Sequence, residues 1–190
     1  MRWKIPVVAI ILLIAVYTFW PFYALYRLAA AAEAKDVAAL EQSVDIRLMR
    51  QSIARQISAT YLAMSGRGAQ FGAASAGVGS VIADALIGEL LTPEALADLL
   101  SKGYMGGAVA ASDAAPLGGF GLNKFGQIWL RSDYGIGNFY VRVPPDHPSP
   151  KQFQLHLRLI QWRWKLVGIQ MPEELRWRLA QEWVKRERRP

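Results

Sequence analysis

The residues that most often carry catalysis are few in this sequence. The only histidines are His147 and His156, and cysteine is absent. A metal centre would then need mainly carboxylate ligands, and no Asp or Glu cluster has a suitable spacing. Asp113, Asp133 and Asp146 could be paired for acid–base work only arbitrarily. We therefore predict no cofactor and no metal site, with His156 a solvated side chain on a strand and His147 part of a turn.

Aromatic residues offer a second kind of chemistry, the binding of an apolar ligand. Their side chains give area and shape to concave pockets, although filling the core is the simpler role. The candidate ligand-binding residues are Trp129, Tyr140, Phe153, Trp162 and Trp164. A small enzyme that uses this aromatic-lined pocket is the alternative to a non-enzymatic binding protein.

Basic residues gather near the end of the chain. The net charge is +7, and residues 151–190 hold ten Lys or Arg against four Glu. Such a concentration suggests a membrane surface or an acidic partner, whereas an ordinary solvated helix face is the simpler reading. The candidate contact residues are Arg176, Arg178, Lys185, Arg186, Arg188 and Arg189.

An apolar run near the N-terminus predicts a membrane anchor. Residues 5–26 contain no charge, and a bilayer core needs roughly 20 apolar residues in a helix. We expect Trp20, Phe22, Tyr23 and Tyr26 at headgroup level, and Pro21 to kink or end the span. A cleaved signal with its cleavage site at residues 29–31 is the rival reading. Arg2 and Lys4 favour a cytoplasmic N-terminus and an exported domain.

Helix signals follow the anchor. Asp36 and Asp45 are placed to cap two helices, the second reaching about Met64. The small residues at 66–79 lack the preceding strand that a phosphate-binding loop needs, and residues 78–91 have the spacing of an amphipathic helix. Thr92 and Pro93 start a further helix that Gly103 ends, with Leu96, Leu99 and Leu100 facing inward.

The apolar period then changes from 3.6 to 2, which predicts four antiparallel strands. The first covers residues 128–131, followed by a turn at 132–138, and the second covers 139–143, followed by a rigid loop at 144–150. In the third strand Phe153, Leu155, Leu157 and Leu159 point one way. The fourth has Trp162, Trp164 and Leu166 on its apolar face, with a bulge near Gly168 where the parity shifts.

These signals predict an α+β fold with an N-terminal transmembrane helix and helices packed on a four-stranded antiparallel sheet. The expected parts are the anchor at 1–26, a helical part at 27–103, a Gly/Ala-rich connection at 104–121, the sheet at 122–172 and a basic C-terminal helix at 173–190.

Several stretches resemble the bacterial domain of unknown function 2939 family. They are Tyr23 and Tyr26, residues 31–36, residues 44–53, the helix start at Thr92 to Glu94 with Leu96 and Leu99, and Trp164, Lys165, Leu166, Ile169 and Pro172. The resemblance implies a protein anchored by one span or a lipid. The family has no known activity, so the resemblance adds nothing about chemistry. Because cysteine is absent, the span is the visible anchor. The helix and sheet order also looks like the cone of the cystatin-like or nuclear transport factor two-like folds, a likeness of fold alone.

We therefore expect a single-pass protein of the bacterial inner membrane, with its N-terminus in the cytoplasm and its domain in the periplasm. The expected role is non-enzymatic binding or scaffolding in the cell envelope. Its partners would be the membrane, including anionic headgroups at the C-terminal helix, and an envelope protein or acidic polymer. Nucleic-acid binding would need a cytoplasmic domain and is not expected.

Overall fold

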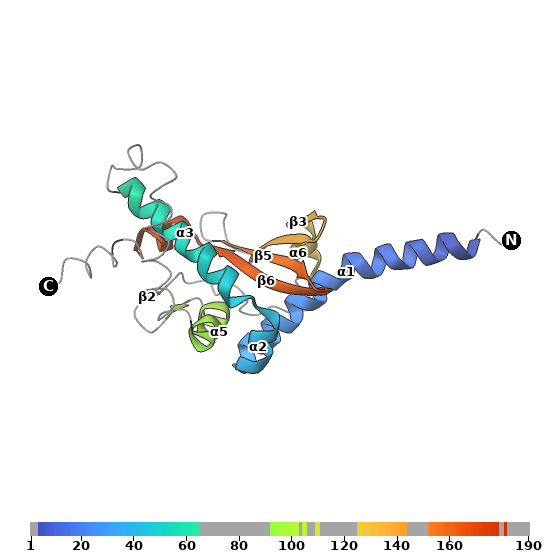
Figure 1. Cartoon of the computed structure of the whole chain (residues 1–190), viewed down its shortest axis with the longest axis horizontal. Coiled ribbons are helices and arrows are strands. Elements are labelled where there is room, and N and C mark those ends of the chain that lie inside the picture. Colours follow the sequence, from blue (N-terminus) through green and yellow to red (C-terminus); the bar gives the residue numbers. More distant parts are fainter. Residues whose placement is uncertain are drawn as a thin grey trace.

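The computed structural model describes residues 4–64, 92–102, 104–105, 109–110, 125–143, 152–178 and 181. The helices are α1 (Lys4–Ala34), α2 (Val37–Ser43), α3 (Ile46–Met64), α5 (Pro93–Lys102) and α6 (Phe125–Leu130). The strands are β1 (Tyr104–Met105), β2 (Val109–Ala110), β3 (Ser132–Gly135), β4 (Asn138–Val143), β5 (Phe153–Ile160) and β6 (Arg163–Gln170). Residues 173–178 are also helical. Figure 1 shows the resulting α+β architecture, as predicted.

The main sheet has the strand order β3-β4-β5-β6, and every neighbouring pair is antiparallel. This confirms the predicted four-stranded meander, which is open rather than closed. β1 and β2 pair separately as a short antiparallel ladder inside the segment that we expected to be a connection.

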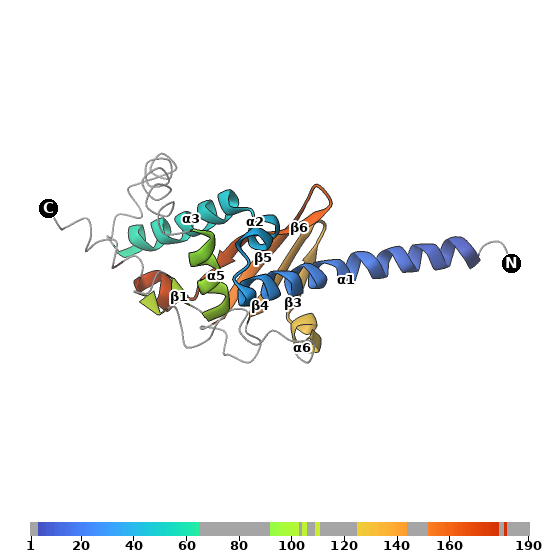
Figure 2. The same cartoon turned by 90° about the horizontal axis from the view of Figure 1, so that it is seen from below.

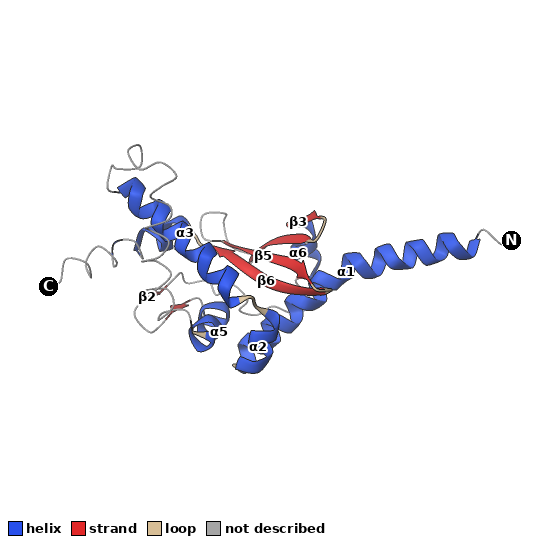
Figure 3. Ribbon diagram, viewed as in Figure 1, coloured by secondary structure: helices blue, strands red, loops and turns tan. Residues whose placement is uncertain are grey.

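One face of the sheet forms the core. The alternate residues Phe139, Val141 and Val143 of β4 and Phe153, Leu155 and Leu157 of β5 are buried, as predicted. The second half of α1 covers them together with α2 and α5, which lie together below the sheet in the view of Figure 3, and buried residues of α3 belong to the same core. Burying one such side chain contributes about 1.5–3 kcal/mol, so the residues of this face together make a large contribution to stability.

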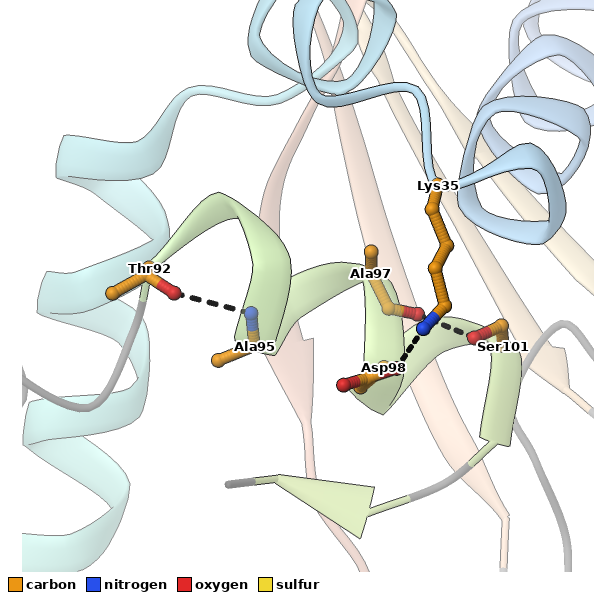
Figure 4. A network of polar contacts seen from close by, with 6 residues as sticks. All are labelled: Lys35, Thr92, Ala95, Ala97, Asp98 and Ser101. Atoms are coloured by element: carbon orange, nitrogen blue, oxygen red, sulfur yellow. Dashed lines mark hydrogen bonds and ion pairs between the residues drawn. The ribbon is translucent and has the colours of Figure 1, made fainter. Parts of the chain in front are cut away.

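The predicted helix caps are confirmed. Asp36 Oδ1 accepts a hydrogen bond of 3.0 Å from the Ala39 N–H, and Asp45 Oδ1 accepts one of 3.1 Å from the Leu48 N–H. Thr92 Oγ1 accepts one of 3.2 Å from the Ala95 N–H at the start of α5 (Figure 4).

α5 is also attached to the end of α1. Lys35 follows α1 in the left-handed conformation, with φ 54°. Its Nζ lies 3.4 Å from Asp98 Oδ1 of α5, as Figure 4 shows. The pair therefore links the turn after α1 to a helix that is distant in sequence.

α3 covers the edge of β6. The Asp45 N–H donates to the Leu166 carbonyl at 2.9 Å. Farther along, Gln56 Nε2 donates to the Ile169 carbonyl at 2.7 Å, and Gln56 Oε1 accepts from the Met171 N–H at 2.9 Å. These bonds satisfy groups that an edge strand would otherwise expose for pairing with another chain.

The predicted bulge near Gly168 is confirmed. His156 pairs with Gly168 while Leu157 pairs with Leu166, so that Val167 is the extra residue. A Cβ on Gly168 would lie 2.8 Å from Ser52 Oγ of α3. Glycine at this position therefore permits the close approach of α3 to β6.

The first strand was predicted in the wrong place. Residues 125–130 form α6, and the strand is β3, inside the segment predicted as a turn. The turn itself is only Ile136 and Gly137, where Gly137 has φ 70°. β3 is an edge strand that is mostly exposed, so its sequence shows no apolar alternation. α6 is so short that the spacing of its apolar residues resembles the two-residue period of a strand.

Trp162 was also misassigned, since it lies in the turn between β5 and β6 with its side chain 79% exposed. Gln161 and Trp162 both have positive φ, at 49° and 62°. A two-residue turn with this geometry suits the twist of a hairpin but usually employs Asn or Gly. A non-glycine residue held there costs of order 1–3 kcal/mol and often marks a functional position.

Some expectations fall outside the described residues. These are the small-residue segment at 66–79, the helix at 78–91, Gly103, Asp113, the loop at 144–150 with Asp146 and His147, and most of the C-terminal helix, including Lys185, Arg186, Arg188 and Arg189.

Candidate functional site

The first half of α1 projects from the domain as an apolar rod (Figures 1 and 2). Ile5 is 75% exposed and Leu13 69% exposed, and the apolar residues between them are exposed on every side. Among the described residues, α1 is the one helix long and apolar enough to cross a membrane by length and composition. This feature is compatible with a single membrane span or with a signal sequence.

The second half of α1 has a different role. From Pro21 onward one side of the helix is buried, with Phe22, Leu25 and Leu28 in the core. Phe22, which we expected at headgroup level, packs inside the domain instead. Trp20, Tyr23 and Tyr26 remain on the exposed side.

Pro21 does not end α1, although it alters the helix locally. It has no N–H to donate to the carbonyl of Tyr17, four residues earlier, and its ring crowds that carbonyl. Figure 1 shows the two halves of α1 running in different directions, as expected for a proline inside a helix.

An aromatic cluster fills the place where α1 enters the domain. We call it the aromatic junction, and its members are Tyr17, Phe19 and Phe22 of α1, Trp129 of α6, Tyr134 of β3, Phe139 of β4 and Trp164 of β6. The Phe22 ring stacks on Trp129 with 5.1 Å between centroids and meets Phe139 edge-on at 5.0 Å. Such pairs add about 0.5–1.5 kcal/mol beyond simple burial.

Two hydrogen bonds attach α1 to the β3–β4 hairpin within this junction. The Gly137 N–H donates to Tyr17 Oη at 3.1 Å, and the Tyr134 hydroxyl donates to the Thr18 carbonyl. Burial raises the pKa of the Tyr134 phenol, and Tyr17 adds to the rise. Tyr134 therefore keeps its proton and remains a donor over the physiological range.

The five predicted ligand-binding residues do not share one surface. Trp129 and Trp164 belong to the aromatic junction, and Phe153 is buried in the core. Tyr140 lies on the opposite face of the sheet, where its ring stacks on His156 with 4.2 Å between centroids. Trp162 lies in the β5–β6 turn. Only Trp129 and Trp164 are brought into one aromatic cluster.

Of the two histidines, His156 lies in the described part of the chain, and its surroundings are polar. Its Nε2 lies 3.0 Å from Asn138 Oδ1, so the ring donates this hydrogen bond as the Nε2–H tautomer. Desolvation lowers the pKa of His156, and the Arg158 charge lowers it further. In the described part of the chain, no group of three His, Asp or Glu side chains gathers to hold a metal ion.

Part of the predicted basic surface is described. Arg178 is exposed, Arg176 is half-buried, and both lie in the helical residues 173–178. In Figures 1 and 2 this segment lies at the end of the domain away from the free half of α1.

The sequence reasoning missed most of the aromatic junction. It assigned the N-terminal aromatics to the bilayer and Tyr134 to a turn. The signal that could have revealed the role of α1 was the periodic spacing of Phe22, Leu25 and Leu28, which places them on one side of a helix.

The fold and the junction define an α+β protein whose domain is built directly onto a helix that is apolar enough to cross a membrane. Residues 10–99 match the family model described as protein of unknown function DUF2939, which confirms the resemblance to this family over these residues, whereas its part at residues 164–172 lies outside the match. The match takes in most of α1, all of α2 and α3, and α5 as far as Leu99, whereas β3 to β6 follow it. The comparisons with curated proteins and with solved structures found no match.

Proposed function

We propose that this chain is a single-pass protein of the bacterial inner membrane, in which α1 anchors a periplasmic domain that binds or scaffolds other components of the cell envelope. The observation that carries the proposal is the exposed apolar half of α1, because water would surround its large apolar surface if no lipid did. Arg2 and Lys4 before the span favour a cytoplasmic N-terminus.

The packing of α1 supports an uncleaved anchor over a cleaved signal. Cleavage at residues 29–31 would fall within α1, where Ala29 and Ala31 are buried. It would also remove Phe22, Leu25 and Leu28 from the core. Each large core side chain that is lost costs about 2–5 kcal/mol, so the domain needs this part of α1 to fold.

For the scaffolding role, the basic C-terminal segment is the proposed contact with an acidic envelope polymer or protein. The arrangement of residues 173–178 away from the free half of α1 favours such a partner over headgroups of the bilayer that α1 enters. A small enzyme in an aromatic-lined pocket remains the alternative to this role.

Fractionation of the full chain, with topology reporters at its two ends, tests the anchor. We expect the protein in the membrane pellet after alkaline carbonate extraction, with residues 1–31 retained and a C-terminal reporter active only in the periplasm. A soluble product that begins after Ala31, or a cytoplasmic C-terminal reporter, would overturn the proposal.

A charge placed in the exposed half of α1 provides a sharper variant. Ile10→Arg with Leu13→Arg should release the chain from the membrane pellet, since arginine at the centre of a span costs about 2.5–3.5 kcal/mol per residue. Ile10→Leu with Leu13→Ile is the matched control and should stay in the pellet. Both positions are exposed, at 56% and 69%, so the domain core is left intact.

A further inference from the structure

The free part of α1 is short compared with a bilayer. Tyr17 is the first residue of α1 bonded to the sheet among the described contacts. From Lys4 to Val16 the helix rises about 20 Å at 1.5 Å per residue, whereas the hydrocarbon core of a bilayer is about 30 Å thick. A helix that spans the bilayer therefore brings the edge of the domain down to the lipid surface, or the bilayer thins around it.

Three exposed apolar residues belong to segments that contact α1 at this level. Ile136 is 99% exposed, Leu130 84% and Trp162 79%. Ile136 precedes Gly137, which bonds to Tyr17, and Leu130 follows Trp129, which packs on Phe19 and Phe22. Trp162 lies at the tip of the hairpin that carries Trp164, a neighbour of Tyr17.

We propose that Leu130, Ile136 and Trp162 form a membrane collar, a ring of side chains that enters the interfacial layer of the bilayer around α1. This proposal rests on the anchoring role of α1. The collar lies next to the exposed apolar surface of the helix, and Figure 2 shows α1 passing between α6 and the tip of the β5–β6 hairpin. One lipid surface can cover both.

The chemistry of the collar suits the interfacial layer. Tryptophan is enriched at headgroup level because its ring is amphipathic. Trp162 has a positive φ in the β5–β6 turn, and this conformation directs its side chain away from the core. Arg158 and Arg163 are exposed near the same hairpin tip, where anionic headgroups can meet them. The collar therefore offers apolar tips with cations beside them.

The two junction hydrogen bonds fit the same placement. Polar groups close to hydrocarbon must find internal partners because water is scarce there. The Gly137 N–H donates to the Tyr17 hydroxyl oxygen, and the Tyr134 hydroxyl donates to the Thr18 carbonyl. The domain edge can thus approach the lipid without leaving these groups unpaired.

Depth-dependent quenching of site-specific labels tests the collar. Because the chain has no cysteine, single substitutions allow attachment of an environment-sensitive fluorophore to the full chain. The sites are Ile136→Cys and Leu130→Cys in the collar, Leu12→Cys in the free half of α1, and Glu174→Cys as an exposed control at the far end of the domain. The host is a vesicle of phosphatidylcholine with phosphatidylglycerol, containing spin-labelled lipids of known depth.

We expect the collar labels to be quenched several-fold more than the Glu174→Cys label, and most strongly by the shallow spin label. The Leu12→Cys label should be quenched most strongly by the deep spin label. If the Leu12→Cys label is quenched but neither collar label is quenched more than the Glu174→Cys label, the collar is overturned and the anchor is retained. Absence of deep quenching at Leu12→Cys would overturn the anchor itself, and the collar with it.

Discussion

The backbone N–H of Gly137 donates a hydrogen bond of 3.1 Å to the hydroxyl of Tyr17, although the two residues are 120 positions apart in the sequence. Tyr17 lies in α1 directly after its free part, and Gly137 lies in the two-residue turn between β3 and β4. Together with the aromatic junction, this contact attaches α1 to the sheet at the point where the helix leaves the domain. The position of the sheet therefore depends on the position of α1.

Tyr17→Phe should weaken this attachment without emptying the aromatic junction. The ring remains against Trp164, while the Gly137 N–H loses its acceptor. We expect the free energy of unfolding in detergent micelles to fall by about 0.5–1.5 kcal/mol, the usual net value of one hydrogen bond. Tyr23→Phe is the matched control, since Tyr23 is 61% exposed in the same helix, and it should be neutral. Equal effects of the two variants would contradict the assigned role of the hydroxyl.

Phe22→Ala should be far more damaging. Phe22 is 3% exposed and contacts Trp129, Tyr134 and Phe139. Truncation of a buried phenylalanine typically costs about 3–5 kcal/mol, so denaturant unfolding of the full chain should show a loss of that size. Ile14→Ala, in the exposed half of the same helix, should leave domain stability unchanged. A comparable loss for Ile14→Ala would mean that the free half of α1 also packs on the domain.

Much of the fold could be predicted from the sequence because its signals are local. Asp36, Asp45 and Thr92 mark helix starts through bonds to backbone groups three residues later, and the alternation of β5 identifies its buried face. β3 could not be found in this way. An exposed edge strand has no buried side chains to impose a period, so its existence depends on pairing with β4.

The aromatic junction depends on contacts that no local pattern contains. Phe22 lies in a stretch that is apolar enough for lipid, and only the sheet, more than a hundred residues later in the chain, decides that it is a core residue. Trp162 illustrates the opposite error. Its two-residue spacing from Trp164 predicts a shared face, whereas a tight turn at Gln161 and Trp162 turns it outward.

Gly168→Ala should be destabilising because of α3. The new Cβ would meet Ser52 Oγ at 2.8 Å and Ser52 Cβ at 3.3 Å, and overpacking of this kind costs about 1–3 kcal/mol. Ser52→Ala removes the closer atom and should recover part of the loss in the double variant. A double-mutant cycle of unfolding free energies measures the coupling. Strictly additive effects would contradict the proposed contact.

Gly126→Ala provides the control for that experiment. A Cβ at Gly126, in α6, would meet nothing within 4 Å. Alanine is favoured over glycine inside a helix by up to about 1 kcal/mol, so this variant should be neutral or slightly stabilising. The two glycines thus separate the steric cost at the bulge from the general effect of replacing glycine with alanine.

The environment of His156 predicts a pH dependence of stability. Its pKa in the folded domain is lowered from 6.5, first by desolvation and then by the Arg158 charge. The unfolded chain therefore binds a proton more readily than the folded one, so the contribution of His156 is fully present above pH 6.5 and is lost as the pH falls through the folded pKa. His156→Gln keeps an amide N–H for Asn138 and does not titrate.

The measurement is the free energy of unfolding of the full chain and of His156→Gln as the pH is lowered from about 7.5. The difference between the two should be constant above the unfolded pKa and should then shift steadily against the original chain. Because Asp, Glu and His147 are present in both proteins, their titration cancels in this difference. A constant difference across the range would show that His156 has the same proton affinity in the folded and unfolded states, which would contradict the predicted pH dependence.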